Sequence, residues 1–112
     1  MSGWCGARIG CGRVLQVVEH TLLHYRLAAD YLERRDALRS DHLALVGEFR
    51  ERGHLTLAGA LTDPGGDALL VFATGDTAVA HEFARRDPYV REGLVTDYDV
   101  RGWAVVDEFT RP

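Results

Sequence analysis

His42 and Asp87 are the two residues whose types and positions could support acid-base chemistry. His42 lies within an apolar stripe, between Leu38 and Leu45, where an imidazole without a hydrogen-bond partner would be costly to bury. Asp87 precedes Pro88, at a point where a helix must end and a carboxylate is held on a turn. Each also has a purely structural interpretation, because buried polar groups are usually just hydrogen-bonded and Asp before Pro often only terminates a helix.

Arg39 and Tyr89 are candidates for substrate binding. Arg39 precedes His42 by one helical turn, so its guanidinium could face the same pocket and orient an anionic or phenolate substrate. The alternative for Arg39 is a solvated surface arginine, and Tyr89 is as well suited to packing as to walling a pocket or forming a phenol hydrogen bond. Ser40 lies two positions before His42, on a different side of the helix, which argues against covalent Ser-His-Asp catalysis.

The sequence lacks the spacing of a metal site or a phosphate-binding loop. The sequence has no second Cys or His pair that would complete a zinc-finger site with Cys5 and Cys11, and it contains no His-Glu-x-x-His motif. Gly65 and Gly66 lie in a turn cluster and indicate a hairpin. We therefore expect no metal and no other cofactor, and a free, reduced pair of cysteines.

Length and composition indicate one globular domain. The chain has 112 residues, 46% of them hydrophobic and 27% charged, as in an average soluble protein. Thirteen basic against seventeen acidic residues give a net charge of −4 without a basic stripe, so we expect neither nucleic acid nor a membrane as partner. The opening residues lack a secretory signal and no long apolar run follows, which favours a cytoplasmic location. Residues 1–21, rich in glycine, are predicted to be an extension, either flexible or an added edge strand, and 22–112 the domain.

Apolar periodicity predicts the elements that position these residues, in the order strand 22–31, helix 37–52, strand 54–61, strand 68–74, helix 76–86 and strand 94–106. Asp36 or Ser40 is predicted to cap the first helix and Gly53 to end it. Asp76 is predicted to cap the second helix, which must stop near Asp87. This order is typical of the ferredoxin-like βαββαβ plan, an α+β fold with a four-stranded antiparallel sheet and both helices on one face.

In such a fold, no helix covers the opposite face of the sheet. Aromatic residues on both faces of the first and last strands, such as Tyr25 against Tyr98 or Trp103, indicate that this face is covered. A second copy of the chain is the simplest cover, so we expect a homodimer of the dimeric α+β barrel type. Because both helices lie on one face, His42 and Asp87 could approach one another, but spacing alone does not decide whether they meet.

From Tyr25 to about Val106 the chain resembles the YciI-like family, also called YCII-related proteins. The matching stretches are Leu32-Glu33-Arg34-Arg35 through Ser40-Asp41-His42-Leu43, Gly53-His54-Leu55-Thr56-Leu57-Ala58-Gly59-Ala60-Leu61, Arg86-Asp87-Pro88-Tyr89-Val90-Arg91-Glu92-Gly93-Leu94-Val95 and Tyr98-Asp99-Val100-Arg101-Gly102-Trp103. The third stretch is the most specific. The last departs from the family, which often has Pro before the Trp where this chain has Gly102.

The resemblance implies a ferredoxin-like fold, a homodimer and a site built on a His and an Asp, which map onto His42 and Asp87. Most members have no established substrate, and the clearest chemistry of the family is elimination of hydrogen chloride from a chlorinated hydroxyhydroquinone. We therefore expect a small enzyme, lyase-like or hydrolase-like, in which a His-Asp dyad performs acid-base chemistry on a small polar or aromatic molecule. The alternative is a non-catalytic module that binds a small ligand or serves as an accessory dimer.

Overall fold

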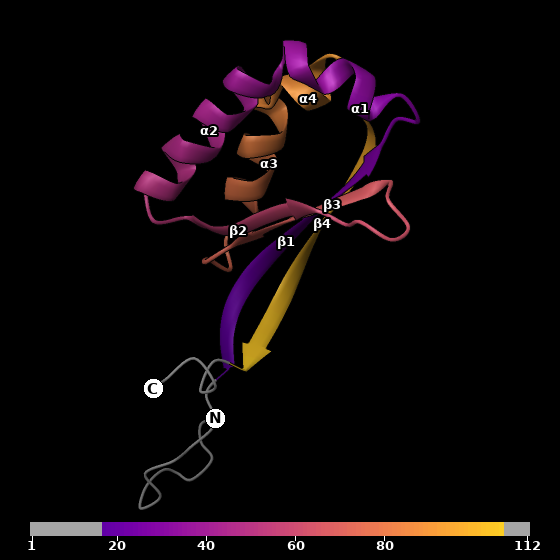
Figure 1. Cartoon of the computed structure of the whole chain (residues 1–112). Helices are drawn as coiled ribbons and strands as arrows, with labels where there is room; N and C mark the ends of the chain where they lie inside the picture. Colours follow the sequence, from indigo (N-terminus) through magenta and orange to yellow (C-terminus); the bar gives the residue numbers. More distant parts are fainter. Residues whose placement is uncertain (1–16, 107–112) are drawn as a thin grey trace, which may run out of the picture.

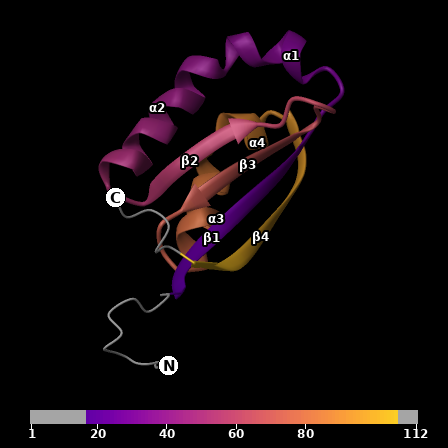
Figure 2. The same ribbon diagram turned by 60° about the horizontal axis from the view of Figure 1, so that its bottom comes forward.

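The structure, a computed structural model, describes residues 17–106 and consists of one sheet with helices on one side (Figure 1). The strands are β1 (Val17–Leu27), β2 (Leu55–Ala60), β3 (Asp67–Phe72) and β4 (Val95–Val106). They lie in the order β2-β3-β1-β4, and every neighbouring pair is antiparallel (Figure 2). This is the predicted ferredoxin-like α+β arrangement. The predicted extension up to residue 16, with its two cysteines, lies outside the described residues.

Within the described residues, five helical segments cover a single face of this sheet (Figure 1). They are α1 (Tyr31–Arg34), the 3-10 turn η1 (Arg35–Ala37), α2 (Arg39–Glu51), α3 (Thr77–Arg86) and α4 (Pro88–Arg91). Each helix described is too short to cross a membrane.

The first strand is displaced from its predicted bounds. It starts at Val17 rather than Leu22, because β1 pairs with β4 along its whole length. It ends at Leu27, and Tyr31 belongs to α1, so the prediction that the strand continues through Tyr31 is wrong. The Tyr31 N–H donates to the carbonyl of Ala28 and closes a turn, which the alternating pattern of the sequence concealed.

The first long helix starts without a capping side chain. It is preceded by Leu38, and neither Asp36 nor Ser40 caps it, so both cap predictions are wrong. The reason is that η1 leads directly into α2, and the Leu38 N–H already donates to the carbonyl of Arg35 within this helical run. The end of α2 is as predicted, since Gly53 follows it with a φ of +80°, a left-handed conformation that glycine adopts easily.

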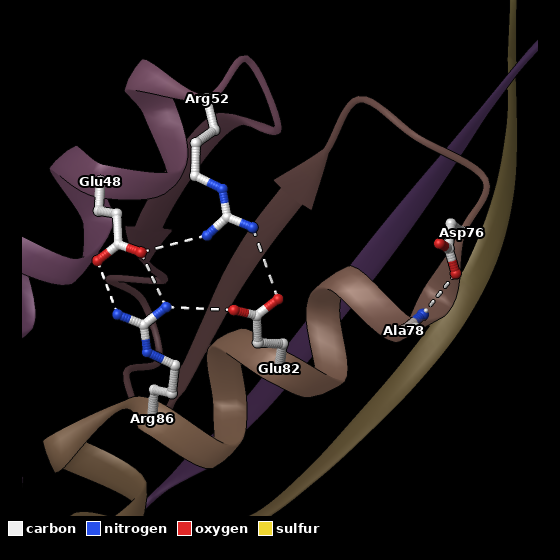
Figure 3. Close-up of polar contacts among 6 residues, drawn as sticks. All are labelled: Glu48, Arg52, Asp76, Ala78, Glu82 and Arg86. Carbon is white, nitrogen blue, oxygen red and sulfur yellow. Dashed lines mark hydrogen bonds and ion pairs between the residues drawn. The ribbon is translucent and has the colours of Figure 1, made fainter.

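The second long helix matches its prediction at both ends. Asp76 accepts a hydrogen bond from the N–H of Ala78 at 3.0 Å (Figure 3), and α3 stops at Arg86, before the Asp87-Pro88 pair. Pro88 then starts the short helix α4, which the sequence did not predict. Asp87 is thus the junction between two helices.

Aromatic side chains join the helices to the sheet. Phe49 of α2, Phe83 of α3 and Phe72 of β3 are fully buried. The Phe49 and Phe83 ring centroids are 5.1 Å apart and those of Phe72 and Phe83 are 5.7 Å apart, in edge-to-face contacts. This cluster fixes α2 and α3 side by side on the sheet.

Four charged side chains bridge α2 and α3 on their solvent side, and we call them the α2–α3 ion-pair ring (Figure 3). Arg86 contacts Glu48 at 2.7 Å and Glu82 at 3.2 Å, and Arg52 contacts Glu48 at 3.2 Å and Glu82 at 3.6 Å. The guanidiniums of Arg52 and Arg86 also lie over the ring of Phe49. The ring therefore ties together the helix that carries His42 and the helix that ends at Asp87.

The sheet face turned away from the helices, here the open face, carries apolar and charged side chains. Leu57 of β2 pairs with Val71, and Val71 pairs with Leu22, which places all three on this face. Trp103 of β4 lies opposite His20 on the same face, whereas Tyr25 and Tyr98 face the helices, so Trp103 and Tyr25 are on opposite sides of the sheet. Leu57 is 68% exposed and Trp103 is 45% exposed.

Candidate active site

A cavity of about 240 Å³ lies between the helical run of residues 31–46 and strands β1, β2 and β3. The small residues Ala58, Gly59 and Ala60 of β2 form one side and leave the space open. Leu70 and Val46 add apolar walls. The polar groups at the cavity come from residues far apart in the sequence, and they are Tyr25, Tyr31, Arg35, Arg39, His42 and Tyr89.

His42 and Asp87 meet at this cavity. The His42 Nδ1 lies 2.9 Å from Oδ1 of Asp87, so the contact that spacing alone left open is formed. Asp87 is completely buried, and it also accepts hydrogen bonds from the Tyr25 hydroxyl at 2.7 Å and from the backbone N–H of Tyr89 at 3.0 Å. Both of these partners donate to Asp87, as expected for an ionised carboxylate, which can only accept. We therefore assign the ring proton of His42 to Nδ1, where it donates the third hydrogen bond.

Tyr25, on strand β1 of the sheet, donates a hydrogen bond to the Asp87 carboxylate. Burial, followed by the charge of Asp87, raises the pKa of Tyr25 far above its usual value of 10.0. The hydroxyl is therefore protonated and a donor at neutral pH. Sequence analysis assigned Tyr25 only to a strand face, since its contact with Asp87 depends on how β1 is placed beneath the end of α3.

The second ring nitrogen of His42, Nε2, is available for proton transfer. The imidazole stacks on the Tyr89 ring, with centroids 3.9 Å apart and an interplanar angle of 5°, and its edge contacts Phe83. Within residues 17–106, Nε2 has no hydrogen-bond partner, and 15% of the side chain is exposed. A histidine with Nδ1–H held by a carboxylate and Nε2 unoccupied can take up a proton there.

Arg39 and Tyr89, the two predicted binding residues, both line the cavity. The Tyr89 hydroxyl is buried, and its proton has no acceptor among the described residues. Burial is the main cause that raises the pKa of Tyr89 and Tyr31 adds to it, whereas the charges of Arg39 and Arg35 and a hydrogen bond from Arg39 oppose it. The phenol is therefore a protonated donor at neutral pH.

Tyr31 and Arg35 are lining residues that sequence analysis missed. The Tyr31 ring contacts the Tyr89 ring edge-on at 5.8 Å, and the Arg35 guanidinium carbon lies 5.9 Å from the Tyr31 centroid. A signal was present, since Arg35 precedes Arg39 by the four residues that separate neighbouring side chains on a helix, although Arg35 lies in the 3-10 turn η1 before α2. It was obscured because the helix was predicted to begin only at residue 37.

Within residues 17–106, no group of three His, Cys, Asp or Glu side chains is close enough to bind a metal ion. The polar residues at the cavity are instead suited to hydrogen bonding, proton transfer and contact with an anion.

Comparisons with known proteins agree with this architecture. The sequence profile of the YCII-related domain matches residues 18–104, and no curated protein sequence matches. The structure is similar to 5-chloro-2-hydroxyhydroquinone dehydrochlorinase (TftG) from Burkholderia phenoliruptrix AC1100, solved in complex with 2,5-dihydroxybenzoquinone. The TM-score is 0.62 at 17% identity, and the match covers 75% of this chain and 92% of that chain.

A second solved structure, a dimeric ferredoxin-like protein from an uncultured marine organism, matches with a TM-score of 0.50 at 14% identity. The match covers 87% of this chain and 95% of that chain. At these identities the two likenesses support the fold.

Proposed function

Because the chain belongs to the YCII-related domain family, we propose that it is a small lyase-like enzyme in which His42 is the general base and Asp87 orients it. The observation that carries the proposal is the 2.9 Å contact between Nδ1 of His42 and buried Asp87 at the wall of a cavity of about 240 Å³. That volume lies below the roughly 300–1,000 Å³ of pockets for drug-sized ligands, so it suits a molecule of about one ring.

The proposed reaction is an elimination. Nε2 of His42 removes a proton from a carbon of the substrate, the electrons of that C–H bond form a new double bond, and the leaving group departs with its own electron pair. The resulting imidazolium is stabilised by the Asp87 carboxylate, which is already held by Tyr25 and Tyr89. The dehydrochlorinase activity and quinone ligand named for the similar structure support both the reaction type and a ring-shaped substrate.

A substrate-independent probe tests the general base. The ring opening of 5-nitrobenzisoxazole begins with proton abstraction from carbon, breaks the N–O bond and releases a coloured nitrophenolate. We expect the wild-type protein to accelerate this reaction, and His42→Gln to lower the rate by about 10²-fold or more, the usual contribution of a positioned base. Arg85→Gln, an exposed change on α3, should leave the rate unchanged. Release of chloride from 5-chloro-2-hydroxyhydroquinone, followed with the same variants, tests the specific reaction.

The competing function is a ligand-binding module, in which His42 and Asp87 only satisfy one another. The complete set of hydrogen bonds at buried Asp87 is the observation that favours it. Equal rates for wild type and His42→Gln with both compounds would establish this alternative and exclude the enzyme.

We also propose that the protein is a homodimer in which a second copy covers the open face. Exposed Leu57 and Trp103 support it, because monomers rarely expose large apolar side chains together on one face. The dimeric state named for the second similar structure supports it further.

A further inference from the structure

We propose that the cavity recognises its ligand as a small organic carboxylate, whose anionic group is bound by Arg35 and Arg39 and accepts a hydrogen bond from the Tyr89 hydroxyl. The proposal rests on the proposed function only in placing the rest of the ligand beside His42. It adds a substrate class and assigns a binding role to Arg35.

The lining of the cavity carries unpaired positive charge. The guanidiniums of Arg35 and Arg39 line the cavity, whereas no carboxylate side chain among the described residues lines it. Arg39 lies within 4.0 Å of no carboxylate in residues 17–106, and Arg35 contacts only Asp36, at 4.0 Å and with 88% of that side chain exposed. Arg86, in contrast, is held by Glu48 at 2.7 Å. These two guanidiniums therefore carry positive charge that no carboxylate lining the cavity neutralises, which favours an anion beside them.

Tyr89 brings a buried hydroxyl to the same cavity. The residue is 3% exposed, and its hydroxyl proton has no acceptor among the described residues, because the nearby Arg39 guanidinium can only donate to the oxygen. A buried donor without a partner is costly, and a bound acceptor would remove that cost. Arg35 and Arg39 line the same cavity as Tyr89. The Tyr31 ring lies between Arg35 and Tyr89 in this set of contacts, 5.8 Å from the Tyr89 ring and 5.9 Å from the Arg35 guanidinium carbon.

The binding groups follow one another along the helical run formed by α1, η1 and α2. Tyr31, Arg35 and Arg39 follow one another at intervals of four residues and all line the cavity, and His42 follows on the same side. The arginines therefore lie towards the start of the helical run, whereas the imidazole lies further along it. A ligand that binds the arginines through one end can present its other end to Nε2 of His42.

The chemistry of the donors favours a carboxylate over other anions. A carboxylate has two oxygens, which can accept from two guanidiniums and a hydroxyl together, whereas a phenolate offers a single oxygen. The remaining lining is largely apolar, including Leu27, Val46 and Leu70, and suits a hydrocarbon ring rather than a free phosphate. The expected ligand is thus a single-ring or short-chain carboxylate.

Binding of benzoate, with neutral benzamide as its isosteric control, tests this proposal. Two-dimensional ¹H–¹⁵N NMR titrations of the full chain at low salt should show benzoate perturbing the amides of Arg39, His42 and Tyr89. Benzoate should bind at least about tenfold more tightly than benzamide, as expected for charge-assisted hydrogen bonds. Its affinity should fall as sodium chloride is added.

Three variants and one matched control localise the anion. Arg35→Gln and Arg39→Gln should each weaken benzoate binding about fivefold or more, and Tyr89→Phe, which keeps the ring but removes the hydroxyl, about threefold or more. Arg85→Gln should not change it. The amide spectrum of each variant shows whether it is folded, and Tyr89→Phe preserves the test if an arginine variant is not.

The proposal is overturned if benzoate and benzamide bind equally, if benzoate does not bind, or if Arg85→Gln weakens binding as much as Arg35→Gln does. Inorganic phosphate binding as tightly as benzoate would overturn the assignment to an organic carboxylate. Benzoate binding is measured without turnover and 5-nitrobenzisoxazole carries no carboxylate, so the binding assay reports on the arginines and the ring-opening assay on the general base. Failure of carboxylate recognition can therefore be distinguished from failure of the general base.

Discussion

Asp87 contributes both to the candidate site and to the fold. Its carboxylate accepts from His42, Tyr25 and the Tyr89 backbone while fully buried, and it lies between the last residue of α3 and the first of α4. A substitution there changes the tautomer of His42 as well as the helix junction. Tests at this residue must therefore separate chemistry from folding.

The Asp87→Asn variant tests the assignment of the His42 tautomer. In the wild type we expect the proton on Nδ1 and a bare Nε2, because the carboxylate can only accept. An amide can also donate to Nδ1, which permits the tautomer with the proton on Nε2, and the elimination rate should then fall by roughly 10²–10⁴-fold. Long-range ¹H–¹⁵N NMR of the imidazole distinguishes the two forms directly. A wild-type imidazole with its proton on Nε2 would contradict the assignment.

The Tyr25→Phe variant tests the support of Asp87 from the sheet. The ring packing is retained, but the buried carboxylate loses its 2.7 Å donor, so the free energy of unfolding should fall by about 1–3 kcal/mol. Tyr98→Phe is the matched control, because Tyr98 lies opposite Tyr25 on β4 and its hydroxyl makes no hydrogen bond within residues 17–106. Urea unfolding measures both variants. Equal stabilities for the two would show that the hydroxyl of Tyr25 does not support Asp87.

At the scale of the elements, α2 and α3 must be held in register for His42 to reach Asp87. The α2–α3 ion-pair ring contributes to this, and the hydrogen bond from Arg86 is the main influence that holds the pKa of Glu48 below its usual value of 4.5. A carboxyl group with a lower pKa in the folded state stabilises the protein above its unfolded-state pKa. That contribution is lost as the pH falls through the folded-state value.

Glu48→Gln should therefore lower the stability at pH 7 but have progressively less effect as the pH is lowered from about 5 to 3. The effect should be modest and should shrink in 1 M salt, because the ring is exposed to solvent. Glu51→Gln is the control, since Glu51 is exposed on the same helix and forms no ion pair within the described residues. Thermal unfolding between pH 3 and 7 measures the difference. A pH-independent loss in Glu48→Gln would indicate that packing, not charge, is responsible.

The helix ends show which structural features local sequence patterns can predict. Asp76 sets a helix start through its side-chain cap, and Gly53 and Pro88 set helix ends through their backbone preferences; the structure confirms each of them. The start of α2 was predicted incorrectly because a preceding 3-10 turn replaces the side-chain cap, and such a continuation leaves no clear signal in composition.

The candidate site was predictable to the extent that its residues stand out locally. His42 interrupts an apolar stripe and Asp87 precedes a proline, so both could be found without a structure. Tyr25 could not, because its hydroxyl reaches Asp87 only through the placement of β1 beneath α3. Whether His42 and Asp87 touch also depended on the packing of two helices, which no local pattern specifies.

At the scale of the whole molecule, the two faces of the sheet differ in what covers them. The helical face is closed by buried aromatic residues such as Phe49, Phe72 and Phe83. The open face leaves Leu57 and Trp103 exposed, and it also carries ion pairs such as Arg26 with Asp99 at 2.9 Å. An apolar area bordered by charges is typical of a surface that pairs with another protein chain.

Leu57→Glu should disrupt the proposed dimer. Two copies that meet through their open faces bring each glutamate into the apolar part of the interface, where a charge without a partner opposes association. Light scattering coupled to gel filtration should give about twice the chain mass of 12.4 kDa for the wild type and the single-chain mass for Leu57→Glu. Leu32→Glu is the matched control, because Leu32 is 66% exposed, close to the 68% of Leu57, but lies on α1 at the helical side. The Leu32 variant should remain dimeric, and a dimer lost only in that variant would place the interface on the helices instead of the open face.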